Sequence, residues 1–222
     1  MDKGICKKHL IFLGPPGCGK GTQAKLLSEK MGFLHFSTGE ILRESIKSGT
    51  DLGKKVKGIV ESGHLVNDET MKSIISEKFN SLQGEEKFIL DGYPRTVVQG
   101  EDLEEISRST EIEIDRVLYF TVPDEEIVKR ISSRRMCPEC GKIHNLLAMN
   151  ETENPVCSSC STPLEQREDD KPEAVKKRLK VYKKKTKPLV NFYKERKKLT
   201  EINGNDKIDN IFASIKEEVL CL

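Results

Sequence analysis

The stretch Gly14–Thr22, GPPGCGKGT, decides the fold of this chain. It follows the short apolar run His9–Leu13 and precedes Gln23–Leu27, whose residues have helical spacing. A strand, a glycine-rich loop and a helix in this order form a phosphate-binding loop, or P-loop, whose main-chain N–H groups and lysine (here Lys20) contact phosphates. An ordinary tight turn needs neither four glycines nor a lysine, so the stretch predicts a nucleotide-binding site.

One position departs from the general P-loop pattern, in which Ser or Thr directly follows the lysine and holds Mg²⁺. Gly21 occupies that position, and Thr22 comes one residue later. We therefore expect water molecules to supply more of the ligands of Mg²⁺. The loop residues predicted to hold a triphosphate are Gly17, Cys18, Gly19, Lys20, Gly21 and Thr22.

The composition predicts one globular core with small inserts in 222 residues, of which 36% are hydrophobic and 33% charged. A net charge of +2 is too small to argue for nucleic acid, and no apolar run approaches the roughly 20 residues that span a bilayer. The first eight residues contain no signal-peptide core, and three cysteines remain outside two CxxC pairs (Cys6, Cys18 and Cys221). We expect a cytoplasmic protein that binds neither nucleic acid nor membrane.

Apolar, β-rich runs alternate with amphipathic stretches along the chain. This alternation predicts an α/β fold of three layers, with a central parallel sheet of about five strands covered by helices on both faces. A helix expected over residues 173–198 contains Lys187-Pro188, where we expect a kink or break. The expected strands are Leu10–Leu13, Phe33–Phe36, Phe88–Leu90, Val117–Val122 and Leu199–Ile202.

A segment from about Cys137 to Glu165 interrupts the alternation and contains two CxxC pairs separated by sixteen residues. Cys137, Cys140, Cys157 and Cys160 at this spacing fit a tetrahedral zinc site with four thiolate ligands. Because four protein ligands leave no open position, one structural Zn²⁺ per chain is expected to fold the insert. Within it, Lys142 is the one basic residue among four glutamates, which argues against a zinc ribbon that reads nucleic acid.

Arginine is scarce here, since ten of the 38 basic residues are arginines. A guanidinium keeps its charge and offers a rigid fork that matches phosphate oxygens. A surface salt bridge explains any single one, but six lie near the P-loop segments or at the borders of the insert: Arg43, Arg95, Arg130, Arg134, Arg167 and Arg178. Arg130 and Arg134 are four residues apart, which predicts that both face the same side of a helix.

Taken together, these motifs resemble those of the adenylate kinase family in its long form, which has a zinc-binding lid. The matching segments run in order over nearly the whole chain: Gly14–Gln23, Ser37–Gly39, Leu42-Arg43, Gly63–Val66, Leu90–Thr96, Gln99, Arg130, Arg134, the cysteine insert, and Arg167–Asp170 with Arg178. The resemblance implies a P-loop core (1–36, 67–132 and 171–222), a mobile insert that binds a nucleoside monophosphate (37–66) and a mobile zinc lid (133–170). We expect a monomer.

The resemblance also implies residue roles on the acceptor side. Gln99 would hold the adenine of AMP, and Arg43 and Arg95 would hold its phosphate. The main chain contributes at His64, so that residue's side chain has no assigned role. The implied AMP-binding residues are Thr38, Arg43, His64, Leu65, Val66, Gly92, Tyr93, Pro94, Arg95, Gln99, Arg167 and Arg178.

On the donor side, the resemblance implies that ATP lies on the P-loop and contacts Arg130, Arg134, Ile143, His144 and Asp206. His144 stands where many relatives carry a tyrosine. Asp91 matches the family's carboxylate that orients Mg²⁺ through water, and Asp169 and Asp170 match carboxylates that pair with lid-region groups. The groups expected to act in catalysis are Lys20, Arg95, Arg130, Arg134, Arg167 and Arg178.

Phosphoryl transfer needs positioning and electrostatic stabilisation, which suits many arginines and requires no activated nucleophile. The implied reaction is ATP + AMP ⇌ 2 ADP with Mg²⁺, in a site that the two inserts close against water. The near alternative is a kinase that accepts another monophosphate (UMP or GMP) or uses GTP as donor, although Gln99 favours adenine. A regulatory GTPase, the binding-switch alternative, would need DxxG and NKxD motifs, and neither string occurs.

Overall fold

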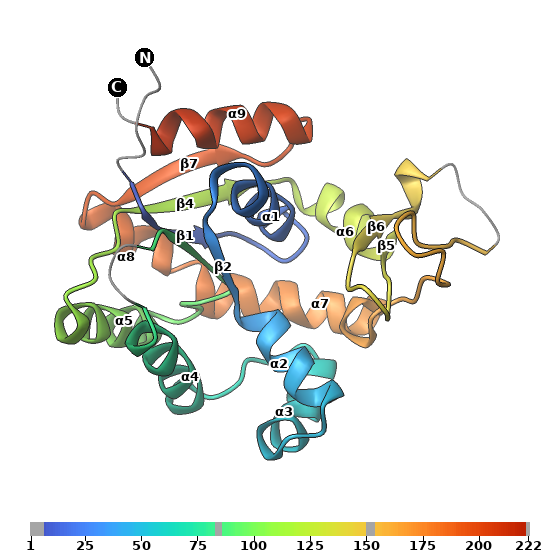
Figure 1. Cartoon of the computed structure of the whole chain (residues 1–222), viewed down its shortest axis with the longest axis horizontal. Coiled ribbons are helices and arrows are strands. Elements are labelled where there is room, and N and C mark those ends of the chain that lie inside the picture. The colour runs from blue at the N-terminus through green and yellow to red at the C-terminus, as the bar shows by residue number, and fades with distance from the viewer. Residues whose placement is uncertain (1–6, 83–85, 150–153, 221–222) are drawn as a thin grey trace.

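The computed structural model describes residues 7–82, 86–149 and 154–220, so Cys6 and Cys221 lie outside the described residues. Its centre is a parallel sheet in the order β2-β3-β1-β4-β7 (Figure 1). Each expected strand is confirmed to within one residue at either end. The strands are β1 (His9–Leu13), β2 (Leu34–Ser37), β3 (Phe88–Asp91), β4 (Arg116–Thr121) and β7 (Leu199–Asn203).

Helices cover both faces of this sheet and give the expected three layers (Figure 1). One face is covered by α1 (Lys20–Met31) and α9 (Ile208–Val219). The other is covered by α4 (Asp68–Asn80), α5 (Val97–Thr110) and α8 (Leu189–Glu195).

The alternation of side chains along β1 explains the two cores. Leu10 and Phe12 pack in the cluster that includes α1 and α9, whereas Ile11 and Leu13 pack in the cluster that includes α4, α5 and α8. Successive side chains of a strand point to opposite faces of a sheet. Because both faces of this sheet are covered, β1 is a continuous apolar run rather than an alternation of apolar and polar residues.

The helix expected over 173–198 is broken, as the Lys187-Pro188 pair predicts. The chain forms α7 (Pro172–Val181), a π-helical turn (Tyr182–Thr186) and then α8. Pro188 lies at the N-cap of α8, where its missing N–H removes no helical hydrogen bond.

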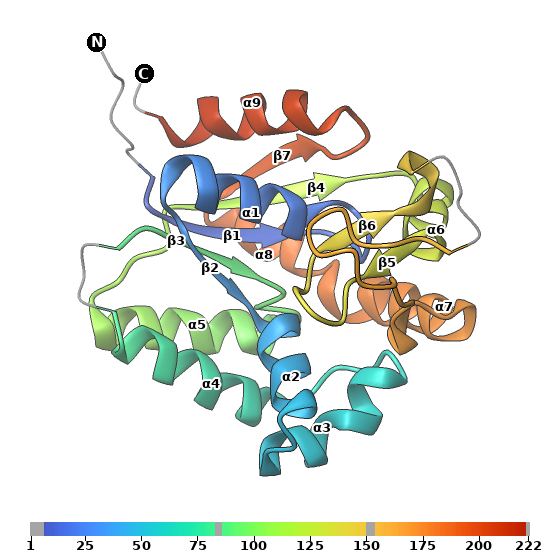
Figure 2. The same ribbon diagram turned by 45° about the vertical axis from the view of Figure 1, so that its right-hand side comes forward.

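Two excursions leave the core at the carboxyl ends of its strands (Figure 2). The first follows β2 and consists of α2 (Thr38–Lys47) and α3 (Asp51–Glu61). The second follows α6 (Asp124–Ser132) and contains the antiparallel pair β5 (Arg134–Met136) and β6 (Ile143–Asn145). At its base Met136 and Glu165 exchange main-chain hydrogen bonds of 2.8 and 2.9 Å, which close the loop between them. Lys47 of α2 donates to the Pro138 carbonyl at 3.2 Å, so the two excursions touch.

Candidate functional site

The P-loop connects the carboxyl end of β1 to α1, as its sequence predicts. Gly19 takes the left-handed conformation (φ 97°) at the N-cap of α1, and no side chain caps this helix end. The first N–H groups of the helix are therefore available to an anion. At Gly14 a Cβ would lie 2.9 Å from both Cys18 Sγ and the Phe120 carbonyl oxygen, so the start of the loop has no room for a side chain.

Lys20 holds its ammonium group inside the loop. Its Nζ donates to the carbonyl oxygens of Gly14 (2.9 Å) and Pro15 (2.8 Å) and lies 3.4 Å from Cys18 Sγ. Cys18 itself is fully buried. A positive charge is thus fixed next to the helix end that attracts anions.

Asp91, at the end of β3, lies beside the P-loop. A Cβ placed on Gly21 would be 3.5 Å from Asp91 Oδ2, and His35 Nε2 of β2 is 3.4 Å from the same oxygen. Burial alone would raise the pKa of Asp91, but the His35 contact and the charge of Lys20 outweigh it and lower the pKa. The carboxylate is therefore ionised where the P-loop pattern would normally supply a hydroxyl for Mg²⁺.

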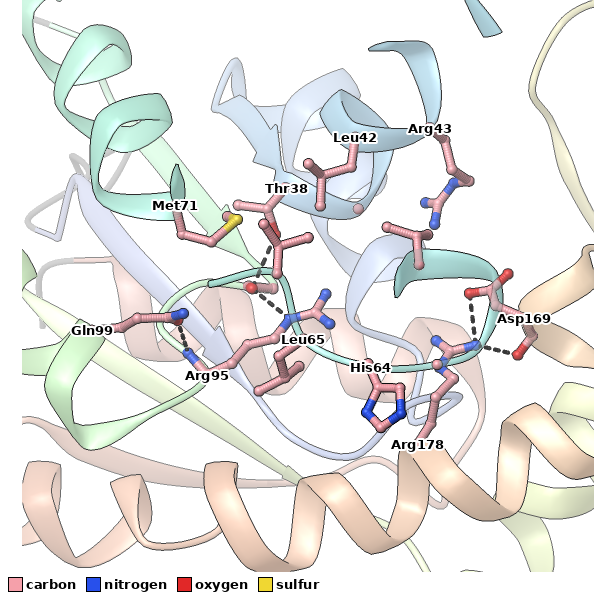
Figure 3. Close-up of a pocket in the computed structure, with 15 residues that line it drawn as sticks. Thr38, Leu42, Arg43, His64, Leu65, Met71, Arg95, Gln99, Asp169 and Arg178 are labelled. Atoms are coloured by element: carbon pink, nitrogen blue, oxygen red, sulfur yellow. Dashed lines mark hydrogen bonds and ion pairs between the residues drawn. The ribbon is translucent and has the colours of Figure 1, made fainter. Parts of the chain in front are cut away.

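A pocket lies between α2, α3 and the segment that follows β3 (Figure 3). Of the expected residues, Tyr93, Pro94 and Arg167 do not line it, and Tyr93 packs in the core instead. Thr38 Oγ1 donates to the Gly92 carbonyl at 2.9 Å, which ties the start of α2 to that segment. The expected acceptor-side residues that line the pocket are Thr38, Arg43, His64, Leu65, Val66, Gly92, Arg95, Gln99 and Arg178.

Arg95 is held at its side chain and at both polar groups of its main chain. Its Nε donates to the Gly92 carbonyl at 2.7 Å, and its main-chain N–H donates to Gln99 Oε1 at 2.7 Å. Its carbonyl accepts from Thr186 Oγ1 at 2.8 Å. Burial, followed by the charge of Arg178, lowers the pKa of Arg95 to about 10. The guanidinium is half-buried and held in place at the lining of the pocket, and its Nη groups can still donate.

Asp170 joins two further arginines. Arg134 Nε donates to Asp170 Oδ2 at 2.7 Å, and Arg178 Nη1 lies 3.1 Å from Asp170 Oδ1 and 2.9 Å from Asp169 Oδ2. The Asp170 side chain has no exposed surface. Burial alone would lower the pKa of Arg134, but its bond to Asp170 raises it. One buried carboxylate thus contacts both Arg134, at the start of the cysteine-containing excursion, and Arg178 of the core.

Positive charge exceeds negative charge in this cluster. Burial, followed by the charges of Arg43 and Arg134, lowers the pKa of Arg167 to about 10. Burial is also the main cause that lowers the pKa of Arg43. The cluster brings together the guanidinium groups of Arg43, Arg95, Arg134, Arg167 and Arg178 and the carboxylates of Asp91, Asp169 and Asp170. Phosphate groups are the ligands that would neutralise such an excess.

The structure corrects the expectation that Arg130 and Arg134 share one face of a helix. Helix α6 ends at Ser132, so Arg134 is the first residue of β5. Arg130 bonds Glu126 at 3.0 Å and donates to the Gly204 carbonyl at 2.8 Å. The spacing of four residues was not informative, because Ser133 ends the helix between the two arginines.

The predicted contacts to the donor nucleoside come from two separate segments. Asp206 follows β7, and its Oδ1 accepts from the N–H of Lys207 at 2.6 Å, next to the Gly204 carbonyl that Arg130 contacts. Ile143 and His144 lie in β6. Burial lowers the pKa of His144 and favours its neutral form.

The four cysteines of the insert come together. Their Sγ atoms all lie within 4.8 Å of one another, with Cys137–Cys160 at 3.4 Å and Cys140–Cys157 at 3.5 Å. A disulfide would need about 2.05 Å, whereas tetrahedral Zn–S bonds of about 2.3 Å place sulfurs about 3.8 Å apart. Main-chain N–H groups of Cys140 and Ser159 point at two of the sulfurs. The residues present therefore fit a metal ion bound by four thiolates.

Sequence reasoning missed Val60 and Met71, which line the pocket, and four residues that support the site or join the two excursions. Asp68 bonds Gln99, Thr186 bonds Arg95, His35 bonds Asp91, and Lys47 reaches the cysteine insert. Each contacts a residue that is distant in the sequence, so no local motif marks it. The break at Lys187-Pro188, next to Thr186, is the one signal in the sequence that marks any of them.

A P-loop beside a cluster of half-buried arginines is the arrangement of an enzyme that transfers phosphoryl groups between nucleotides. Comparison with known proteins agrees with this class. The sequence model of the adenylate kinase family matches residues 12–198. The chain is similar to the adenylate kinases of Petrotoga mobilis (46% identical over 203 residues, 91% of this chain and 93% of the relative) and Archaeoglobus fulgidus (44% over 208 residues, 94% and 96%).

The chain therefore belongs to the adenylate kinase family and is a phosphotransferase. Among the described residues, no helix is both long and apolar enough to cross a membrane.

Proposed function

We propose that this protein catalyses ATP + AMP ⇌ 2 ADP with Mg²⁺. The observation that carries the proposal is the position of Arg95, whose half-buried guanidinium lies at the acceptor pocket four residues after Asp91, the last residue of β3, which lies beside the P-loop. The segment Asp91–Arg95 therefore adjoins both the donor phosphate site at the P-loop and the acceptor phosphate site in the pocket. In-line transfer between two nucleotides requires that these two sites lie next to each other. The relatives' name supports ATP and AMP as the substrates.

In this proposal the P-loop and Lys20 hold the triphosphate, with Arg130, Ile143, His144 and Asp206 on the donor nucleoside's side. Arg43 and Arg95 hold the AMP phosphate, and Gln99 faces its base. Arg130, Arg134, Arg167 and Arg178 surround the group in transfer and stabilise its charge. Asp91 would orient the water ligands of Mg²⁺, which supplies neutralisation of the phosphate charge when it is bound.

The two excursions act as the closing parts. We propose that residues 37–66 bind the monophosphate, that residues 133–170 form a lid, and that both close over a core of 1–36, 67–132 and 171–222 to exclude water. The four cysteines would bind one structural Zn²⁺, because they leave no open coordination position. We further propose that the enzyme works as a cytoplasmic monomer.

A coupled assay of ADP formation, with ATP or GTP as donor and AMP, CMP, UMP or GMP as acceptor, tests the proposal. We expect AMP to be the preferred acceptor by at least a hundredfold in kcat/KM. A higher kcat/KM for UMP or GMP would support the alternative, a kinase for another monophosphate.

A further inference from the structure

The carboxamide of Gln99 is buried and is bonded at both ends by groups of fixed hydrogen-bonding character. Its Oε1 accepts from the main-chain N–H of Arg95 at 2.7 Å, and its Nε2 donates to Asp68 Oδ1 at 2.7 Å. A main-chain N–H can only donate, and an ionised carboxylate can only accept. The orientation of this amide is therefore decided by its two partners, with the oxygen toward Arg95 and the nitrogen toward Asp68.

Each end of a primary amide offers two hydrogen-bonding positions, so one N–H and one lone pair of Gln99 remain. Gln99 lines the pocket together with Thr38 and Met71 (Figure 3). Adenine carries an amino donor at position 6 next to an acceptor at N1. Hypoxanthine and guanine carry the reverse, a carbonyl acceptor at position 6 next to an N1–H donor. An amide that could turn would suit both patterns, whereas a fixed amide suits one.

We propose that Asp68 is a specificity-determining residue that positions Gln99 for adenine and against 6-oxopurine monophosphates. The inference rests on the proposed function, in which Gln99 faces the acceptor base. Turning the amide would set its oxygen against the Asp68 carboxylate and its NH₂ group against the Arg95 N–H. Both mismatches lie in a buried site, where unpaired polar groups are costly. Asp68 acts without touching the nucleotide.

Asp68 is well fixed for this role. It is the first residue of α4, directly after Asn67, whose side chain caps that helix. Its Oδ1 also accepts from Thr96 Oγ1 at 3.2 Å, and Thr96 caps α5, the helix that carries Gln99. One carboxylate oxygen therefore joins the beginnings of α4 and α5, so that Asp68 and Gln99 keep a constant relative position.

The test compares Asp68→Asn with the parent enzyme, with AMP and inosine monophosphate as acceptors. Inosine monophosphate reverses the pattern at position 6 and N1 without adding the amino group of guanine. The substituted amide would have the shape of the carboxylate but could donate or accept, so one of the two mismatches that oppose turning of Gln99 would be removed and only the Arg95 N–H would still oppose it. We expect the ratio of kcat/KM for AMP to that for inosine monophosphate to fall at least tenfold. Glu69→Gln removes the neighbouring exposed charge and should leave the ratio unchanged.

An Asp68→Asn enzyme that unfolds cooperatively and keeps the parent's ratio would overturn the inference. A parallel loss with both acceptors, which a merely structural role would cause, would overturn it as well. If Asp68→Asn does not fold, Asp68→Ser is measured in its place, because a hydroxyl can also donate or accept. A parent enzyme without a preference for AMP contradicts the proposed function itself, whereas a selective parent with an unchanged variant contradicts this inference alone.

Discussion

Arg134 and Asp170 form a buried ion pair across the two ends of the cysteine-containing excursion, with Nε donating to Oδ2 at 2.7 Å. Asp170 also contacts Arg178 of α7. One carboxylate without exposed surface therefore holds an arginine of β5 and an arginine of the core at the same point. Removing one partner of a buried ion pair leaves uncompensated charge, so this carboxylate should matter for stability.

We predict that Asp170→Asn lowers the free energy of unfolding by about 3 kcal/mol, because two guanidinium groups lose their counter-charge. For a chain of this length the melting temperature should fall by roughly 6–12 °C. Thermal unfolding monitored by circular dichroism measures this. Glu168→Gln is the matched control, because Glu168 and Asp170 lie in the same short 3₁₀ helix (Glu168–Asp170) and the exposed Glu168–Lys171 pair contributes little. Equal melting of both variants would refute the assigned role of Asp170.

Lys20→Met should reduce kcat by at least a thousandfold and leave the melting temperature close to that of the parent. The ammonium group bonds only loop carbonyls and a thiol among the described residues, so its loss removes charge from the site rather than packing from the core. Lys25→Met on the same helix is the control and should retain activity. Turnover within tenfold of the parent would rule out the P-loop assignment.

Arg95→Lys and Arg134→Lys should have different kinetic effects, because we propose that Arg95 binds the acceptor phosphate and that Arg134 acts on the group in transfer. Lysine keeps the charge but loses the fork, so Arg95→Lys should raise KM for AMP about tenfold or more and leave KM for ATP nearly unchanged. Arg134→Lys should mainly lower kcat. Steady-state kinetics with each nucleotide varied in turn gives both results. A change confined to AMP binding in Arg134→Lys would place that arginine in the acceptor pocket.

Purified protein should contain about one Zn²⁺ per chain, because the four sulfurs fit one tetrahedral site. Removing the metal with a chelator, or replacing Cys157 and Cys160 with Ser, should lower the melting temperature more than it lowers activity at low temperature. Metal analysis and differential scanning calorimetry measure this, and zinc added back to the chelated parent should restore its melting temperature. Loss of turnover at unchanged stability would instead assign the metal to catalysis.

The stability of the protein should fall in acid partly through Asp169. Burial alone would raise the pKa of Asp169, but Arg178 and Arg43 outweigh it and lower the pKa below its ordinary value. A carboxyl with a lowered pKa in the folded state stabilises the fold above its unfolded pKa, about 4, and loses this contribution as the pH falls further. Urea unfolding from pH 7 to pH 3 should thus show a shallower acid decline in Asp169→Asn than in the parent. Parallel curves would show that Asp169 does not contribute.

The sheet could be predicted closely because its signal is local. The runs that form the central strands β3, β1 and β4 are short and largely buried, whereas the edge strands β2 and β7 are partly exposed. The P-loop and the two CxxC pairs are also local signals, because each is a short motif whose residue spacing brings its phosphate-binding or metal-binding groups together. Arg134 shows the limit of this reasoning, because periodicity does not reveal that α6 ends two residues earlier.

The contacts that support the site could not be read from local patterns. Thr186 reaches the Arg95 carbonyl from a position 91 residues later in the chain, and Asp68 reaches Gln99 from the beginning of another helix. Such pairs depend on how α4, α5 and the π-helical turn pack around the sheet. Only the tertiary structure places them together, so sequence reasoning proposed candidate phosphate-binding groups but did not find the residues that hold those groups.

The main-chain bonds between Met136 and Glu165 have a mechanical consequence for the proposed lid. Arg134 and Arg167 each lie two residues outside this pair, on the two strands of chain that enter and leave the lid. When a rigid body turns about its base, points near the pivot travel least and the distant tip travels most. We therefore expect a swing that carries the cysteine end of the lid through a wide arc to shift these two guanidinium groups only slightly. The proposed lid could therefore open widely for nucleotide exchange while Arg134 and Arg167 keep nearly the same distances to the phosphate positions.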